Sequence, residues 1–90
     1  MSIEAAVTEY ITTEILVPSG RQTEDLDVET SLFRRGIIDS FGLFTLASFL
    51  EQRFSIVVGD EDMVPENFDT ISRIASFVTR RQGAAGVEKT

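Results

Sequence analysis

The chain has 90 residues, and its eight basic and fifteen acidic side chains leave a formal net charge of −7. This length allows one domain, and the negative charge disfavours nucleic acid and anionic lipid as partners while favouring proteins with basic surfaces. The sequence contains no cysteine and no histidine. Disulfides, thiol nucleophiles, imidazole bases and metal sites built on either residue are therefore excluded.

Residues 3–16 have the hydrophobic period of an amphipathic helix. The apolar residues recur at steps of three and four, at Ile3, Ala6, Val7, Tyr10, Ile11 and Ile15. Ser2 is placed to cap the start of this helix, and the run Pro18-Ser19-Gly20 is placed to stop it. We therefore predict a first helix over residues 3–16.

Residues 18–39 show no sustained period and include the acidic run 24–29. A loop of this length in a small domain is uncommon and is usually functional. We predict that its apolar side chains pin it to the core and that residues 30–33 form a short helical turn. The pinning residues are Leu26, Val28, Leu32, Phe33, Ile37 and Ile38.

A second helix is predicted from about Ser40 to Phe54. Its core stripe consists of Leu43, Leu46, Ala47, Leu50 and Phe54, which cluster within about 100° of arc at 100° per residue. Ser40 lies where serine favours the N-cap, and Asp39 lies beside the positive end of the helix dipole.

The remaining residues predict a loop, a short turn and a last helix. Residues 55–62 are read as a loop because no second strand is available for pairing. Pro65 opens a helical turn over 65–68, and Asp69 or Thr70 caps the last helix. Arg80 and Arg81 suit the C-terminal end of that helix, and Gly83 ends it. Its inner face consists of Ile71, Ile74, Ala75 and Val78.

The predicted fold is all-α: a small antiparallel bundle of three main helices and one short helix, with a long loop between the first two helices. The domain is expected over residues 1–81, and residues 82–90 are expected to form a flexible tail.

Three phenylalanines of the second helix lie off its core stripe. Phe44 and Phe49 either pack under the first loop and the last helix or remain exposed. Phe41 lies almost opposite the core by helical spacing. Exposed large apolar side chains beside polar ones often mark partner contacts, so Phe41 is a candidate docking residue.

Acidic residues gather in the same half of the chain, where only Arg53 opposes them between Gly36 and Ser72. They are either a solvated face or a docking field for basic partners. These acids are Asp39, Glu51, Asp60, Glu61, Asp62, Glu66 and Asp69. A calcium loop counted from Asp60 is rejected, because Pro65 and Ile71 stand where glycine and glutamate are required.

The segment Gly36-Ile37-Ile38-Asp39-Ser40-Phe41 resembles the attachment motif of acyl carrier and peptidyl carrier proteins, in which a glycine precedes Asp-Ser and a large apolar residue follows. The resemblance covers about residues 3–81. Three further stretches agree with the family in order, namely Thr30-Ser31-Leu32-Phe33, Leu50-Glu51-Gln52-Arg53-Phe54 and Phe68-Asp69-Thr70-Ile71.

The resemblance implies that Ser40 carries 4′-phosphopantetheine, attached by a phosphopantetheinyl transferase from coenzyme A with Mg²⁺. The arm ends in a thiol that carries acyl or aminoacyl groups as thioesters, which suits a chain without cysteine. Asp39, Phe41, Phe44 and Glu51 would form the docking surface. The implied partners are the phosphopantetheinyl transferase, an acyl- or aminoacyl-activating ligase and a downstream transferase or synthase. The carrier itself is expected to be a monomer and not an enzyme.

The sequence departs from the carriers of fatty-acid synthesis at one place. Those proteins usually have acidic residues two and five positions after the serine, where this chain has Gly42 and Thr45. The segment Ser40-Phe41-Gly42-Leu43 is more similar to free-standing specialised carriers, which load methoxymalonyl, D-alanyl or other amino acid units. A specialised polyketide, nonribosomal or modified-lipid pathway is therefore expected.

Two other functions compete with the carrier. A small acidic adaptor would bind a basic partner through the second helix, with Ser40 only a cap. A carboxylate enzyme would need two acids fixed in a cleft, and nothing in the sequence fixes them. The apolar stretches are too short to cross a bilayer and the first residues do not resemble a secretory signal, so we expect a cytoplasmic location and no membrane partner.

Overall fold

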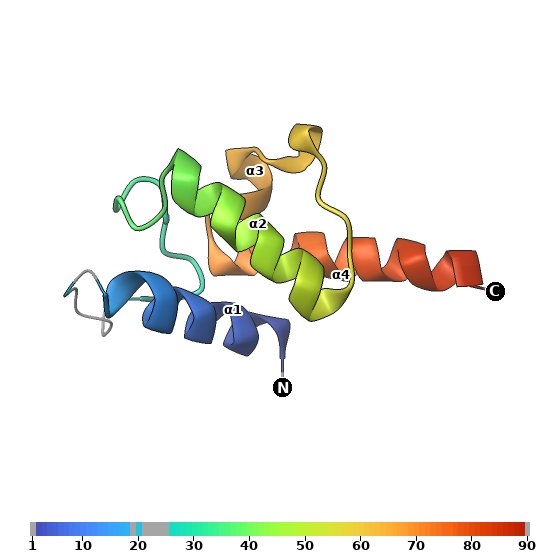
Figure 1. Cartoon of the computed structure of the whole chain (residues 1–90), viewed down its shortest axis with the longest axis horizontal. Helices are drawn as coiled ribbons and strands as arrows, with labels where there is room; N and C mark the ends of the chain where they lie inside the picture. The colour runs from blue at the N-terminus through green and yellow to red at the C-terminus, as the bar shows by residue number, and fades with distance from the viewer. Residues whose placement is uncertain (1, 19, 21–25, 90) are drawn as a thin grey trace.

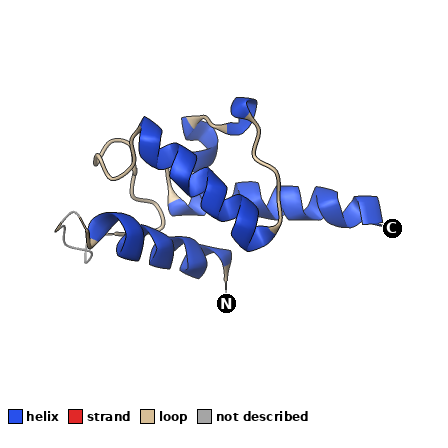
Figure 2. Cartoon of the chain, in the orientation of Figure 1, coloured by secondary structure: helices blue, strands red, loops and turns tan. Residues whose placement is uncertain are grey.

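The computed structural model describes residues 2–18, 20 and 26–89, without the side chains of residues 84–89. These residues form helices joined by loops and contain no strand (Figure 2). The predicted all-α fold class is confirmed.

The first helix has a regular part and a wider last turn. Helix α1 spans Ile3–Ile11, and the π-helical turn η1 continues it over Thr12–Leu16. Ser2 caps α1 as predicted, because its hydroxyl oxygen accepts the Ala5 N–H at 3.0 Å. The Thr13 hydroxyl donates to the Glu9 carbonyl at 2.8 Å. This side-chain bond competes with regular backbone pairing where the helix widens.

The connection from η1 to the next helix is pinned to the core as predicted. Leu32 and Ile38 are buried, and the other four predicted pins pack against the core. The predicted helical turn at 30–33 is found two residues later, as a hydrogen-bonded turn over residues 32–36. It closes at Gly36, whose φ of +71° favours glycine. Ser19 and residues 24–25 of the acidic run lie outside the described residues.

Helix α2 spans Ser40–Phe54, with the predicted bounds. Leu46, Ala47 and Leu50 of its stripe are buried, and Leu43 and Phe54 are half-buried. Ser55 ends the helix in the left-handed conformation, with φ of +57°. The helix lies beside α1 in the bundle (Figure 1), and a ring contact between Tyr10 and Phe49 joins the two.

Three elements complete the bundle. A 3-10 turn, η2, spans Asp60–Asp62, the short helix α3 spans Pro65–Phe68, and α4 spans Ile71–Lys89. Of the two predicted caps for the last helix, Thr70 is the one used, since its hydroxyl oxygen accepts the Arg73 N–H at 3.0 Å. Among the residues described, no helix combines the length and apolar character needed to cross a membrane.

The core lies where α4 packs against α1, α2 and α3. It includes Phe77, which the predicted inner face of α4 omitted and which packs on Phe68 with ring centroids 5.3 Å apart. The buried cluster consists of Val7, Ile11, Leu16, Leu32, Ile38, Leu46, Leu50, Ile56, Phe68, Ile71, Ile74, Phe77 and Val78. Long-range packing of these residues fixes α2 and the loop before it.

The predicted end of the last helix at Gly83 is wrong, because α4 continues to Lys89. Alanines follow Gly83 in the sequence, and alanine is the best helix former. No proline follows to stop the helix. The C-terminal turns of α4 therefore extend beyond the other helices (Figure 1). The domain boundary at residue 81 and the flexibility of residues 82–90 stay predictions.

We predict that Gly83→Ala increases helix content and stabilises α4 by about 0.5–1 kcal/mol, because glycine in a helix costs backbone entropy. A Cβ at this position meets nothing within 4 Å. Circular dichroism and amide exchange at residues 79–83 measure the effect. Gly36→Ala is the control and should destabilise the protein, since its φ is +71°. A comparable destabilisation by Gly83→Ala would show that Gly83 terminates the helix after all.

Candidate functional site

Ser40 is the first residue of α2, and its side chain is exposed. The structure gives its hydroxyl no hydrogen-bond partner among the described residues. The start of α2 is the end nearest the loop over residues 26–39 (Figure 1). The oxygen of Ser40 is therefore accessible to a partner enzyme.

Asp39 caps α2. Its backbone is extended, with φ of −116° and ψ of −169°, and its carboxylate accepts the Gly42 N–H at 2.8 Å. The prediction of Ser40 as the N-cap is therefore wrong by one residue. Aspartate caps helices as well as serine does, and its negative charge also interacts favourably with the helix dipole. Since Asp39 takes this role, capping does not occupy the Ser40 hydroxyl.

Asp69 holds the segment that leads to Ser40. Its carboxylate accepts the Ser31 hydroxyl at 2.7 Å and the Phe33 N–H at 3.3 Å, and its backbone carbonyl accepts the Leu32 N–H at 2.6 Å. The Leu32 carbonyl in turn accepts the N–H groups of Ile37 and Ile38, at 2.9 and 3.2 Å. This chain of hydrogen bonds joins the start of α4 to the residue before Asp39.

Two aromatic rings lie exposed on the first turns of α2. Phe41 is 80% exposed and Phe44 is 61% exposed. The exposure expected for Phe41 is confirmed, and the alternative in which Phe44 packs under the first loop and the last helix is wrong. Rings this exposed beside Ser40 suit contact with a partner protein, and the docking role of both residues stays a prediction.

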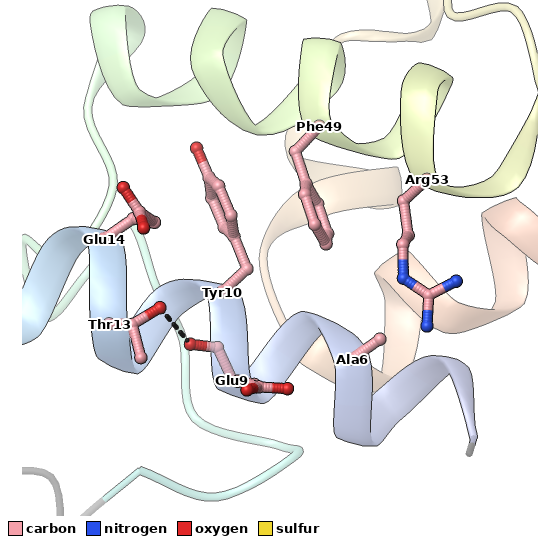
Figure 3. A pocket seen from close by; sticks show the side chains of 7 residues that line it. All are labelled: Ala6, Glu9, Tyr10, Thr13, Glu14, Phe49 and Arg53. Carbon is pink, nitrogen blue, oxygen red and sulfur yellow. Dashed lines mark hydrogen bonds between the residues drawn. The ribbon is translucent and has the colours of Figure 1, made fainter.

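Phe49 is half-buried, and its ring contacts two other aromatic rings. Its ring stacks on Tyr10 of α1, with centroids 4.3 Å apart and planes 21° apart (Figure 3). It also makes an edge contact with Phe54, at 6.4 Å between centroids. Both ring contacts of Phe49 are therefore with helical residues of α1 and α2, and its packing under the first loop and the last helix stays a prediction. Burial and the nearby Glu14 carboxylate raise the pKa of the Tyr10 hydroxyl.

Glu51 does not share the surface around Ser40. It lies eleven residues further along α2, which at 1.5 Å per residue is about 16 Å along the helix axis. Its carboxylate is half-buried and accepts the Val58 N–H at 2.9 Å. Glu51 thus holds the loop that follows α2, and its predicted docking role gains no support from this position.

Another acid of the predicted docking field also has a structural role. Asp62 accepts the Gly59 N–H at 3.0 Å and pairs with Arg81 of α4. The Gly59 N–H foremost, with help from Arg81, lowers the pKa of the Asp62 carboxyl. Arg73 donates to the Glu66 carbonyl at 3.4 Å. Basic residues from later in the chain thus contact this acidic segment. The count of charges between Gly36 and Ser72 could not include them.

The start of α2 fits a tethered phosphate. The backbone N–H groups of Ser40 and Phe41 have no acceptor within the described ranges, and they lie at the positive end of the helix dipole. An anion there gains hydrogen bonds without displacing the Asp39 cap. No cluster of acidic side chains suited to a metal ion is found in the part of the chain that the structure describes.

Comparison with known proteins identifies the family. The family described as "Phosphopantetheine attachment site" matches residues 9–78, which include α2 and most of the core. The chain belongs to this family. It is also 31% identical over 78 residues to the "Probable acyl carrier protein PigG" of Serratia sp. (strain ATCC 39006), a match that covers 87% of this chain and 86% of the relative. The molecule is thus a carrier protein that holds 4′-phosphopantetheine covalently on a serine.

The division of roles between Asp39 and Ser40 predicts opposite results for two adjacent substitutions. Asp39→Ala should cost about 0.5–2 kcal/mol of stability because the carrier loses the cap of α2. Ser40→Ala should change stability by less than about 0.5 kcal/mol, as surface substitutions usually do. Urea unfolding of the unmodified proteins measures both. A larger loss of stability for Ser40→Ala than for Asp39→Ala would show that Ser40 caps α2.

The lowered pKa of Asp62 predicts a pH-dependent contribution to the carrier's stability. The ionised carboxylate stabilises the folded state fully above its ordinary pKa of 3.8, and this stability is lost as the pH falls through the lowered folded-state value. Asp62→Ala should therefore cost about 1–2 kcal/mol at pH 7.

The cost of Asp62→Ala should shrink as the pH falls from 4 towards 2, as measured by urea unfolding across that range. The exposed neighbour Asp60→Ala makes the same charge change and serves as the control. A cost of Asp62→Ala that does not vary with pH would contradict the role of the ionised carboxylate.

Proposed function

We propose that Ser40 is the serine that carries 4′-phosphopantetheine. The observation that carries this proposal is the exposed, unpartnered hydroxyl of Ser40 at the first residue of α2. Two other serines of the matched range are placed less well. Ser31 donates its hydroxyl to Asp69, and Ser55 ends α2 in the left-handed conformation.

Each residue around Ser40 has a distinct part in this proposal. When bound, the arm supplies a terminal thiol that carries acyl or aminoacyl groups as thioesters. Ser40 would supply the oxygen for attachment, and the N–H groups of Ser40 and Phe41 would be available to donate to the phosphate. Asp39 keeps α2 capped throughout, and Phe41 and Phe44 offer an apolar contact to partner enzymes.

The partners follow from the carrier role. A phosphopantetheinyl transferase installs the arm, an acyl- or aminoacyl-activating ligase loads it, and a downstream transferase or synthase accepts the cargo. We propose that the carrier is a cytoplasmic monomer that catalyses no reaction itself and binds neither nucleic acid nor membrane. The substitution of acidic residues by Gly42 and Thr45 supports a specialised pathway, in which docking depends more on apolar contact than in fatty-acid synthesis.

The alternative function, an acidic adaptor without a prosthetic group, no longer explains why a serine stands at position 40. In that function the serine serves only as a cap, and Asp39 performs the capping instead. The exposed rings of Phe41 and Phe44 are equally compatible with either function. Membership of the phosphopantetheine-attachment family favours the carrier.

The proposal predicts that the purified protein gains one 4′-phosphopantetheine group when incubated with coenzyme A, Mg²⁺ and a broad-specificity transferase. Intact mass spectrometry measures the gain, and peptide fragmentation should place it on Ser40. Ser40→Ala should abolish the gain. Ser48→Ala, which removes another exposed serine of α2, should leave it unchanged.

A full mass gain on Ser40→Ala, or attachment at another serine, would overturn the assignment of Ser40. A failure of the unsubstituted protein to gain mass would overturn the carrier function as proposed.

A further inference from the structure

Two adjoining hollows form a groove between the first helix and α2. Its near half is an open hollow of about 300 Å³, lined by residues that include Tyr10, Glu14, Ile15, Phe41, Gly42 and Thr45. Its far half is a second hollow of about 350 Å³, which shares Tyr10 and Glu14 and extends to Phe49 and Arg53 (Figure 3). The near half starts at Phe41, the residue that follows Ser40 in the chain.

The near half of the groove combines aromatic rings with one charge. Phe41 and Tyr10 present apolar and aromatic surface, and Glu14 is the charged side chain of its lining. Glu14 and Tyr10 line this hollow together, and burial first, then the Glu14 carboxylate, raise the pKa of the Tyr10 hydroxyl. Glu9 adds a second carboxylate in the far half, and Arg53 lies at the end away from Ser40.

This chemistry selects between classes of cargo. A protonated amine is attracted by carboxylates and by the faces of aromatic rings. A cargo that ends in a carboxylate is repelled by Glu14 at the same place. A neutral acyl chain gains from the rings but not from the charge.

We infer that the α1–α2 groove receives the cargo carried from Ser40 and favours an aminoacyl group with a free amine. This inference rests on the proposed attachment at Ser40. The amine lies near Glu14 between Tyr10 and Phe41, and the side chain of the amino acid extends along the rings towards Phe49. Among all the acyl groups that the arm could carry, the groove thereby favours those that bear a positive charge.

The test loads the full chain with two matched cargoes. Coenzyme A analogues in which an amide replaces the thioester deliver either a leucyl group or a 4-methylpentanoyl group, which has the same carbon skeleton without the amine. Intact mass confirms loading. Amide chemical shifts, measured by NMR against the protein with the unloaded arm, then report where each cargo lies.

We expect shifts at Tyr10, Glu14 and Thr45 that are about two- to fivefold larger for the leucyl group, the range that a partly exposed charge contact provides. Glu14→Gln should remove the difference between the two cargoes. Glu4→Gln is the matched control on the same helix, since Glu4 lies outside the lining of the groove, and it should keep the difference.

The possible failures are distinguishable. A mass gain with equal shifts for both cargoes would overturn the preference for an amine. A mass gain with no shift on α1 would overturn the groove as the binding site, while the attachment at Ser40 would stand. No mass gain would overturn the attachment itself.

Discussion

The placement of Ser40 depends on the hydrogen bonds that Asp69 makes to residues 31–33. Residues 26–39, which lead into α2, contain no helix or strand to fix them, and they must still present one hydroxyl at a defined place. Asp69 lies just before α4, the helix against which the rest of the bundle packs. Through Ser31 and Leu32, the rigid end of that helix therefore sets the position of the turn that leads into α2. Burial of Leu32 and Ile38 completes the attachment of this loop to the core.

The features that the sequence predicted well are those determined by local rules. The apolar stripe of α2, the Ser2 cap and the proline that opens α3 each depend on a few neighbouring residues. The all-α fold and the exposure of Phe41 follow from the same spacing. The proposal of Ser40 as the attachment residue came from its motif, since its chemistry is not visible in a hydrophobic pattern.

The features that the sequence missed depend on contacts between distant residues or on small shifts in a boundary. Phe49 is covered by Tyr10, and Arg81 returns to Asp62 nineteen residues earlier, contacts that no local window contains. The cap of α2 differs from its prediction by one residue because aspartate and serine are equally good caps in adjacent positions. Gly83 was read as a helix end, but α4 continues through it, since alanines follow and no proline interrupts the helix.

The use of Asp39 rather than Ser40 as the cap has a consequence for the order of events in the life of this protein. Adding a group to the Ser40 oxygen breaks no bond on which folding depends, and a negative phosphate at a helix start adds to stability rather than subtracting from it. The polypeptide can therefore reach its native state before any cofactor arrives. With the arm on Ser40, as we propose, the transferase would meet an already folded surface, and removal of the arm would leave the same folded molecule.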